Sequence, residues 1–579
     1  MSKALSNITK LNDVSTSSGA GLVGYLPAGT GAVATTIQAQ LRALPRFPEN
    51  DGAVGDGSTD DTAALTKTLN NAAGVEQIFL GPKTYVTGPL TIPSNTIINF
   101  HPQTVLKAKS GYGLNDSLLL IDTVSNITIN ANHGTVQMLK ADYTTGEQRH
   151  GVRIISGTNV TINDLHVKDT GGDGYYIGNN AAASYNIILN NCYSDNARRN
   201  GLSIVSVKNC WVIGGEYANT VGTAPEFGID IEANYSTDSQ ENINLIGVST
   251  RGNSKGGIEV VFGGLGGTAK ASMSVNISNC YSYSDGYYGA LRFANPAVFQ
   301  IQGKVNVTNH TIINPAGRGV DFANQNVLNP PISIRGLSVT NPGFSMASPG
   351  NVDLSAISLY TTNNTGSYTT GNITFEDVSC VDNRASPTMY TGAYVGGTYP
   401  IDKVTFKNMK VANSVSGRKI VIVGTTNTNI NAVQDNPEYI SINGTTPNID
   451  RYSAGDIFTT SSAGNLTLSA ATGMQGLEFT FAPQTTTLTV VPATGDTLFF
   501  QGTAVSTGIV LEAGDRMKLK AIATGWKIIE QDFPLKTGSG TPVGAISTRF
   551  PGRMYYDTTG KLFWMSTGTT SSDWKQITN

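Results

Sequence analysis

Residues 201–234, GLSIVSVKNCWVIGGEYANTVGTAPEFGIDIEAN, contain two copies of one pattern, a glycine followed by a short alternating apolar segment. The copies GLSIV and GIDIE begin at 201 and 228, and related segments begin with glycines at 174 and 257, so the steps are 27, 27 and 29 residues. Alternating segments that contain asparagine lie between them. This period fits three short strands with their turns, which make one coil of a parallel β-helix. The absence of a helical periodicity argues against helical and leucine-rich repeats.

The aligned repeats also predict which way each side chain points, because side chains on a strand alternate between its two faces. The position after the leading residue is apolar in each repeat, and so is the position two residues further on; both are expected to face the core. The position between them is expected to face outward, and it holds Tyr176, Ser203, Asp230, Glu259, Arg292 and Asp321.

Asp230 and Glu232 are therefore expected to project from the outer wall, with Glu226 in the preceding turn and Glu259 on the next coil. Adjacent coils lie about 4.8 Å apart, and neighbouring same-face residues of one strand roughly 6.5–7 Å apart. Cleavage of a glycosidic bond needs two carboxyl groups, about 5–5.5 Å apart for retention or about 6.5–9.5 Å apart for inversion. Both separations are available, and the sequence does not choose between them. The candidate catalytic residues are Glu226, Asp230, Glu232 and Glu259.

Composition limits the possible partners and cofactors. The net charge of −3 and the sequence pI of about 6.0 argue against nucleic acid or an anionic membrane as a partner. The four cysteines form no metal-binding spacing, and neither do the five histidines, so we expect no metal and no cofactor. The cysteines, like Trp211 in NCWVIGG, are expected to pack in the core. We expect neither a signal peptide nor a membrane span, because no long apolar run occurs.

A resemblance to known proteins enters with the flanks of the repeat. The stretch DGAVGDGSTDDTAALTKTLNNAAG (51–74) resembles the N-terminal motif of pectate-lyase-like right-handed β-helices, in which a short helix covers the open end. The stretch SSGAGLVGYLPAGTGAVATTIQAQLR (17–42) resembles the connector of bacteriophage tailspikes. From 17 to about 420 the chain resembles tailspike depolymerases that degrade capsular and other bacterial surface polysaccharides. The resemblance implies a homotrimer in the virion tail, attached to tail or baseplate proteins.

The resemblance also implies that the segment from GGDGYYIG to FGIDIEAN surrounds a sugar groove. Tyr176, on the outer face, is the better platform for stacking a sugar, and Tyr175 is expected in the core. Arginines in this segment are candidates for binding an acidic sugar through bidentate hydrogen bonds. The candidate substrate-binding residues are Asp173, Tyr176, Asp195, Arg198, Arg199 and Arg292.

The fold predicted as a whole is all-β, a right-handed parallel β-helix of a homotrimeric tailspike followed by C-terminal antiparallel β domains. Its expected parts are a connector or virion-attachment remnant at 1–48, the start of the β-helix with its capping helix at 49–118, the β-helix with the active site at 119–445, a β-sandwich-like domain for trimerisation or glycan binding at 446–534, and a small β module at 535–579.

Three functions stay open at this point. The leading hypothesis is an endo-acting glycoside hydrolase that uses paired carboxylates on bacterial polysaccharide. A polysaccharide lyase on the same fold would instead need a base and a cation that neutralises a uronate; the residues that could supply them are Tyr176, Arg198, Arg199, Lys255 and Arg292. A receptor-binding adhesin would bind the polysaccharide without shortening it.

Overall fold

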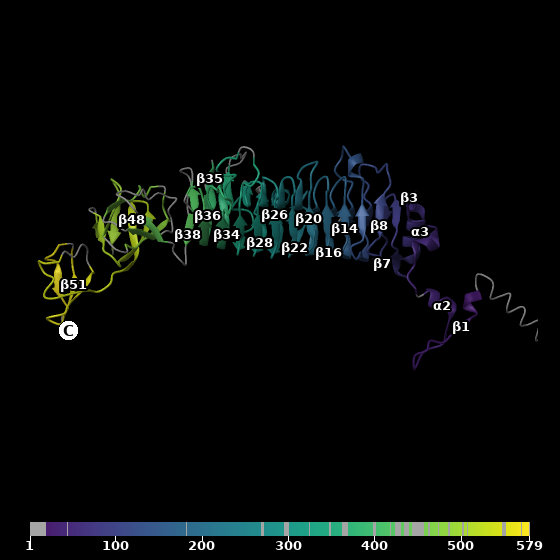
Figure 1. Cartoon of the computed structure of the whole chain (residues 1–579), viewed down its shortest axis with the longest axis horizontal. Coiled ribbons are helices and arrows are strands. Elements are labelled where there is room, and N and C mark those ends of the chain that lie inside the picture. Colours follow the sequence, from purple (N-terminus) through teal and green to yellow (C-terminus); the bar gives the residue numbers. More distant parts are fainter. Residues whose placement is uncertain are drawn as a thin grey trace, which may run out of the picture. The chain divides into compact units, whose positions relative to one another are not determined.

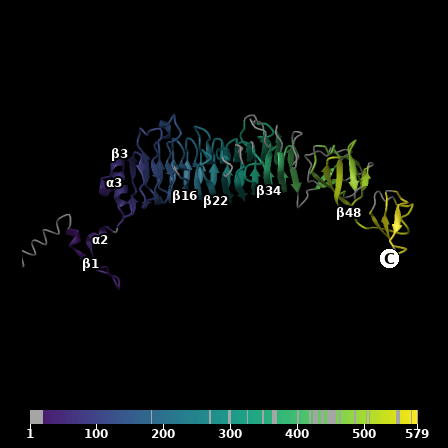
Figure 2. The ribbon, with the colours of Figure 1, turned by 180° about the vertical axis from the view of Figure 1, so that it is seen from behind.

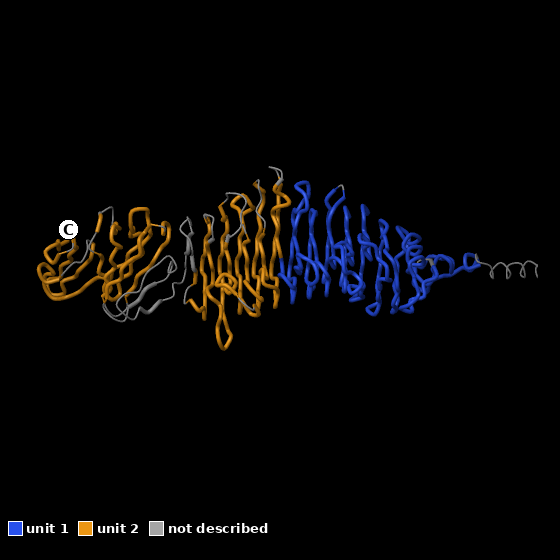
Figure 3. Tube along the Cα trace, turned by 90° about the horizontal axis from the view of Figure 1, so that it is seen from above, with its two compact units in different colours: residues 1–258 blue, residues 259–579 orange. Residues whose placement is uncertain are grey.

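The chain divides into two compact units, residues 1–258 and 259–579 (Figure 3). Residues 1–18 of the expected connector and the expected boundary at 445/446 lie outside the residues described by the computed structural model. The described residues are 19–42, 44–180, 182–267, 271–294, 300–323, 325–346, 349–361, 369–397, 401–416, 419–422, 430–433, 439–442, 457–460, 464–472, 474–483, 487–500, 503–505, 508–546, 552–568 and 570–577.

In the first unit the chain winds into coils of three short strands (Figures 1 and 2). Each strand pairs in parallel and in register with its counterpart on the next coil, so that β16 pairs with β19, β17 with β20 and β18 with β21. The predicted parallel β-helix of the right-handed type is therefore confirmed. These strands are β16 (Ser184–Asn190), β17 (Tyr193–Asp195), β18 (Leu202–Ile204), β19 (Val207–Ile213), β20 (Glu216–Ala218) and β21 (Phe227–Glu232).

The same three-strand order extends through the rest of the unit. The remaining strands are β3 (Asp56–Asp60), β4 (Ile78–Leu80), β5 (Thr84–Thr87), β6 (Leu90–Thr91), β7 (Thr96–Phe100), β8 (Val105–Ala108), β9 (Leu119–Asp122), β10 (Ser125–Asn130), β11 (Thr135–Gln137), β12 (Val152–Ile155), β13 (Thr158–Asn163), β14 (His166–Lys168), β15 (Tyr175–Gly178), β22 (Gln240–Ile246) and β23 (Ser249–Arg251). β24 (Gly256–Val261) crosses the division between the units.

The N-terminal helix α3 (Thr62–Ala72) covers apolar side chains of the first coils. Its buried residues Leu65 and Leu69 line an apolar cavity together with strand residues such as Phe100. The helix starts directly after Asp61, whose carboxylate accepts hydrogen bonds from the backbone N–H groups of Val54 and Gly55. The elements before it are η1 (Gly19–Gly21), β1 (Gly24–Tyr25), β2 (Thr35–Thr36), α2 (Ile37–Arg42) and η2 (Pro48–Asp51).

Asparagines join successive coils where the chain turns with positive φ. The Nδ2 of Asn126 donates to Asn95 Oδ1 at 2.8 Å, Asn159 donates to Asn126 at 3.1 Å and Asn186 donates to Asn159 at 2.9 Å. All four residues have φ between 54° and 63°. Asparagine tolerates this left-handed conformation better than other side chains do, and its amide can both donate and accept. The repeated asparagines in the sequence therefore have a structural cause.

The second unit begins with further coils of parallel strands. Its first long face consists of β25 (Ser272–Ser278), β28 (Gln302–Thr308), β31 (Ile332–Arg335), β34 (Thr370–Val381), β36 (Ile401–Ala412) and β38 (Ile430–Val433). The other faces consist of β26 (Tyr281–Tyr283), β29 (Thr311–Ile313) and β32 (Ser338–Thr340), and of β27 (Gly289–Ala294), β30 (Val320–Ala323), β33 (Ile357–Thr361), β35 (Ala393–Gly397) and β37 (Ile420–Ile422). A short helix, η4 (Gly263–Gly267), follows β24.

The C-terminal strands form separate sheets, as predicted, but these sheets are mixed. β47 (Arg516–Ile522) pairs antiparallel with β42 (Glu478–Phe481) and β48 (Gly525–Asp532), whereas β44 (Thr497–Phe500) pairs parallel with β48. The other strands are β39 (Tyr439–Ile442), β40 (Ile457–Thr460), β41 (Gly464–Thr467), β43 (Leu488–Val491), β45 (Thr503–Val505), β46 (Ile509–Leu511), β49 (Lys536–Gly538), β50 (Met554–Asp557), β51 (Leu562–Ser566) and β52 (Trp574–Gln576).

Candidate active site

The outward column of the first unit has the predicted register. Tyr176 pairs with Ser203, and Ser203 pairs with Asp230 on the next coil. The flanking residues Ile229 and Ile231 are fully buried in the core, which fixes the Asp230 side chain on the outer face. Although it lies on the outer face, Asp230 is only 2% exposed. The alternation shows the direction of a side chain, but it does not show what covers that side chain.

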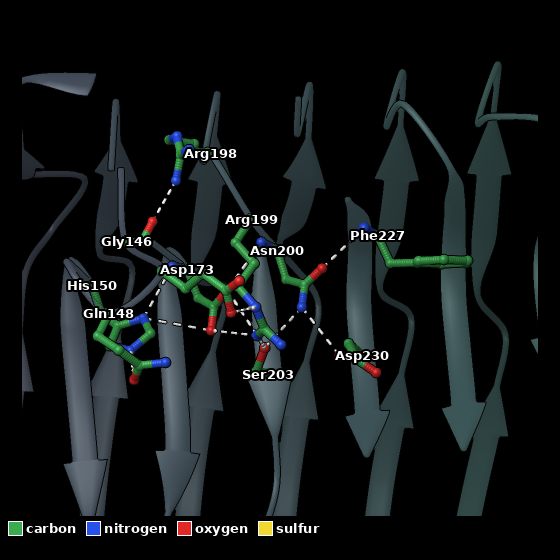
Figure 4. A network of polar contacts seen from close by, with 11 residues as sticks. Gly146, Gln148, His150, Asp173, Arg198, Arg199, Asn200, Ser203, Phe227 and Asp230 are labelled. Atoms are coloured by element: carbon green, nitrogen blue, oxygen red, sulfur yellow. Dashed lines mark hydrogen bonds and ion pairs between the residues drawn. The ribbon is translucent and has the colours of Figure 1, made fainter. Parts of the chain in front are cut away.

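Asn200, in the turn before β18, covers the Asp230 carboxylate. Its Nδ2 donates to Asp230 Oδ2 at 3.1 Å and to Ser203 Oγ at 3.0 Å, and its Oδ1 accepts from the backbone N–H of Phe227 at 3.0 Å (Figure 4). Asn200 is itself fully buried. A single amide thus joins the outer column to the backbone at the start of β21.

Arg199, next in the chain, is the centre of the site. Its Nη1 donates to Asp173 Oδ2 and to Ser203 Oγ, both at 3.3 Å (Figure 4). Its Nε lies 3.6 Å from Glu147 Oε2. Burial opposes its charge, but carboxylates around it raise its pKa above the usual value. These carboxylates are those of Asp173, Asp230, Glu147 and Glu232.

Asp173 is brought to the site, but it is fully buried behind Arg199. Burial raises its pKa, and the Arg199 guanidinium opposes this rise. Its backbone N–H donates to His150 Nδ1 at 3.0 Å, and His150 Nε2 lies 3.1 Å from Gln148 Oε1. Burial also lowers the pKa of His150 well below its usual value, so this imidazole is neutral. The arrangement holds Arg199 in place from behind.

Tyr176 is also held inside the wall. Its ring stacks on His150 with centroids 4.8 Å apart, and the Arg153 guanidinium lies 5.8 Å from the ring centroid. The ring passes over Gly178, where a Cβ would come within 2.6 Å of Tyr176 Cε1. Burial raises the pKa of Tyr176. Its ring is thus committed to packing on these three residues.

Glu232 differs from the other acids of this region. It ends β21, is half-buried, and burial raises its pKa, with Arg199 opposing the rise. Among the described residues, no cation lies within ion-pair distance of its carboxylate. The carboxyl therefore holds its proton more strongly than a solvent-exposed glutamate does.

Glu226 lies in the same region, but it closes a turn. Its Oε1 accepts from the backbone N–H of Gly222 at 2.6 Å, and its Oε2 lies 3.6 Å from Lys255 Nζ. Its own φ is 61°. These contacts bind the carboxylate to the loop before β21.

Glu259 and Arg292 lie in the second unit, where they are paired with each other. Arg292 Nη1 lies 2.7 Å from Glu259 Oε1, and its Nε lies 3.4 Å from Asp321 Oδ2. The guanidinium also lies 4.6 Å from the Tyr288 ring centroid. The charges of Glu259, Arg292 and Asp321 in the outward column are thus compensated by ion pairs with one another.

Two predicted binding residues lie away from Arg199 and have structural partners. Asp195, exposed at the end of β17, accepts from Asn219 Nδ2 at 2.7 Å. Arg198 donates from Nη2 to the carbonyl of Thr144 at 3.2 Å and from Nη1 to the carbonyl of Gly146. It therefore fastens the loop that carries Glu147.

Sequence reasoning missed two aromatic residues on the outside of the first unit. Tyr235, three residues after Glu232, is 70% exposed, and its backbone N–H donates to Asp238 Oδ2 at 2.8 Å. Trp211 was expected in the core, but it is half-exposed between the fully buried Cys210 and Val212. A count of the two-residue alternation from the cysteine would have placed it outward.

Other expectations concern metals, membranes and cysteines. In the described part of the chain, no group of three or more His, Cys, Asp or Glu side chains is arranged to hold a metal ion. None of the described helices is both long and apolar enough to cross a membrane. All four cysteines are buried, and burial raises the pKa of Cys192 to about 12.

Sequence comparison finds short stretches of similarity to proteins of bacteriophage and bacteria. No family model matches the chain. The capsule K30/K69-specific depolymerase of Klebsiella phage K64-1 is 36% identical over 104 residues, which are 18% of this chain and 12% of the depolymerase. The uncharacterized protein YclG of Bacillus subtilis (strain 168) is 27% identical over 236 residues, 35% of this chain and 40% of YclG. The chain thus matches less than half the length of either relative.

Solved structures share the fold at low sequence identity. The tailspike of Escherichia coli bacteriophage HK620, in complex with a pentasaccharide, is 11% identical with a TM-score of 0.55 over 90% of this chain and 96% of the tailspike. The A-module of the Azotobacter vinelandii mannuronan C-5 epimerase AlgE4 is 14% identical with a TM-score of 0.51 over 66% of this chain and 99% of the module. The chain resembles phage tailspikes and depolymerases, and it shares their β-helix.

Proposed function

We propose that this chain cleaves a bacterial surface polysaccharide by endo-glycosidic hydrolysis, with Glu232 as the proton donor. One observation carries the proposal: Glu232 is a half-buried carboxyl with a raised pKa, two residues from Asp230 on the same outer face of the β-helix. A general acid must keep its proton at the working pH, and burial does this for a glutamate. The likeness to a phage capsule depolymerase supports a polysaccharide as the substrate.

Asp230 is the second carboxylate in this proposal. Asn200 holds one of its oxygens, which fixes the orientation of the carboxylate. Same-face residues of one strand lie roughly 6.5–7 Å apart. That spacing leaves room for a water molecule between carboxyl groups, as inverting enzymes require at about 6.5–9.5 Å. Asp230 then activates water, Glu232 protonates the leaving oxygen, and the anomeric configuration inverts.

Arg199 places a positive charge close to both carboxylates. Asp173 holds this guanidinium from behind, and His150 in turn contacts Asp173. Asp173 lies directly against the Arg199 guanidinium, so its proposed role is to position that side chain. Glu226 and Glu259 take structural roles in this proposal, since each carboxylate already has partners.

Tyr235 replaces Tyr176 as the proposed platform for a sugar ring. An exposed tyrosine offers a flat apolar face together with a polar edge, and sugar rings have the same two characters. The Asp238 carboxylate fixes the backbone at both Asn234 and Tyr235. The ring is therefore presented on a pre-organised turn beside Glu232, which lowers the entropy lost on binding.

The assembly is also a proposal. We place the chain in a virion tail as a homotrimer, joined to tail or baseplate proteins through its N-terminal part, because the resemblance is to phage tailspikes. Size measurement of the purified chain by light scattering tests the trimer.

The test compares Glu232→Gln and Asp230→Asn with Glu241→Gln, in which an exposed ion pair with Lys208 is lost. Purified capsules from several strains are digested, and product length and new reducing ends are measured. General acid–base groups contribute about 10²–10⁴-fold, so we expect losses of that order in the first two variants and unchanged activity in the control. Full activity in both site variants would disprove the assignment of residues.

The same digestion decides between the three functions. Products with the ultraviolet absorbance of an unsaturated uronate would show a lyase, in which Arg199 neutralises a uronate. The four carboxylates around Arg199 disfavour an anionic sugar there, so we expect reducing ends without that absorbance. Binding without any shortening of the polymer would show an adhesin and would overturn the enzymatic proposal.

A further inference from the structure

Two histidines that are far apart in the sequence meet on the outside of the first unit. His133 lies in the turn before β11, and His166 begins β14 on the next coil. His133 Nδ1 lies 3.3 Å from His166 Nε2, and the two rings are nearly perpendicular, with an angle of 81° between their planes. The 33-residue separation is hidden in the sequence, because coil stacking alone brings the two residues together.

The distance between these nitrogens matches that between two ligands of one metal ion. Zinc binds imidazole nitrogen at about 2.0–2.1 Å with tetrahedral angles, which places two ligand nitrogens about 3.3 Å apart. In the metal-free chain the same distance allows one ring N–H to donate to the other nitrogen. The observed separation therefore fits a shared cation without any movement of the two rings.

The backbone holds both imidazoles in this arrangement. The N–H of His133 donates to the Asp164 carbonyl at 2.9 Å, and the N–H of His166 donates to the Gly134 carbonyl at 3.1 Å. The Tyr193 ring packs on His166 with centroids 4.4 Å apart, while its hydroxyl donates to Asn191 Oδ1. These contacts hold the two rings close together on successive coils.

The two rings differ in exposure, since His166 is half-buried on β14 while His133 lies at the surface. His133 is exposed, which leaves open an approach for a hydrated ion.

We propose that His133 and His166 bind one divalent cation of the zinc type, with water completing its coordination. The site is independent of the proposed catalytic residues, and it would join two successive coils of the β-helix. Imidazole suits Zn²⁺, Cu²⁺ and Ni²⁺, whereas Mg²⁺ and Ca²⁺ prefer oxygen ligands, so these last two ions should not compete.

The experiment titrates the metal-free full-length chain with Zn²⁺ by calorimetry and follows thermal unfolding with and without the ion. His133→Asn keeps a residue that tolerates φ of 69°, His166→Gln keeps a polar side chain on β14, and His101→Ala removes a histidine outside the pair. We expect one ion per chain, a zinc-dependent rise in melting temperature, and at least a tenfold loss of affinity in each of the first two variants. His101→Ala should bind like the wild type.

Absence of saturable zinc binding by the wild type would overturn the proposal, and so would binding that survives both substitutions. Excess Mg²⁺ serves as the control for non-specific attraction, and displacement of zinc by it would also count against an imidazole site. Circular dichroism of each variant verifies that a lost signal does not come from a lost fold.

Discussion

Asn200→Ala should loosen the start of β21, because one buried amide holds three partners there. Nδ2 of Asn200 donates to Ser203 Oγ and Asp230 Oδ2, and Oδ1 accepts from the N–H of Phe227. Phe227 and Asn200 are fully buried, and Asp230 is nearly so. Water therefore cannot replace these hydrogen bonds without a local opening of the chain.

The magnitude follows from the groups left behind. A buried donor or acceptor that loses its partner costs about 1–3 kcal/mol, and a charged group costs more. Alanine leaves the Phe227 N–H without an acceptor and takes one donor from the Asp230 carboxylate. We expect local opening to become easier by about 3–5 kcal/mol, which corresponds to amide exchange on the order of 100- to 4,000-fold faster.

Hydrogen–deuterium exchange measured by mass spectrometry on peptides within 220–234 tests this, because it reports local opening without requiring reversible global unfolding. Asn190→Ala is the control, since its Nδ2 donates to Asn163 in an exposed ladder. Asn200→Asp keeps an acceptor for Phe227, but it places a carboxylate oxygen where Nδ2 donates to Asp230, so it should restore only part of the protection at that amide. Exchange at Phe227 within threefold of the wild type in the alanine variant would refute the reasoning.

Three further predictions concern the same wall. Glu232→Gln should raise the melting temperature at pH 7. Burial places the pKa of this carboxyl in the folded chain above its value in the unfolded chain, so the wild type loses stability as pH rises through the interval between the two values. The advantage of the glutamine variant should therefore vanish near pH 3, about one unit below the unfolded pKa. Arg198→Ala releases the carbonyls of Thr144 and Gly146, so limited proteolysis within 143–149 should become several-fold faster while the coils stay intact. Gly178→Ala places a methyl 2.6 Å from a Tyr176 ring carbon and should destabilise the first unit by about 1–3 kcal/mol in thermal unfolding; an unchanged melting temperature would contradict the packing described.

The coils could be predicted from the sequence because their cause is local and repeated. Ile229 and Ile231 alternate with Asp230, and the same alternation recurs one coil away at Leu202 and Ile204. The alternation of apolar and polar residues shows which face of the strand each side chain occupies, and the repeat period shows which residue lies beside it on the next coil. Together they predicted the observed register. The mixed pairing of the C-terminal strands has no such period, and it could not be predicted in this way.

The state of each side chain in the site could not be predicted, because it depends on what a turn of another coil lays over it. Asp230 is buried by Asn200, which precedes its strand by a whole coil. The loop that carries Glu147 reaches Arg199 from 52 positions earlier in the chain. Residues in turns have no alternation to follow, so their contacts become visible only in three dimensions.

The outward column differs between the two units in how its charged side chains are paired. Those of the second unit form ion pairs with one another, whereas Glu232 in the first unit forms none among the described residues. In the second unit acids and bases alternate: Glu259 pairs with Arg292, and Arg292 pairs with Asp321. The series continues through Arg318 to Asp353. Each charge there has an opposite neighbour, which is the arrangement expected when buried charges must only be tolerated.

The end of β21 in the first unit breaks that rule. Four carboxylates surround Arg199, and Glu232 stays half-buried with a raised pKa instead of an ion pair. Selection for stability alone would have favoured a neutral residue at this position, since desolvating an unpaired charge opposes folding. Glu232 is a half-buried carboxyl with a raised pKa on the outer face, and the neighbouring Asp230 carboxylate is held by Asn200. A role as proton donor to a substrate explains why a glutamate is present at this position. The stability gain predicted for Glu232→Gln and the activity loss predicted for the same variant are therefore two consequences of one cause, and finding either without the other would separate them.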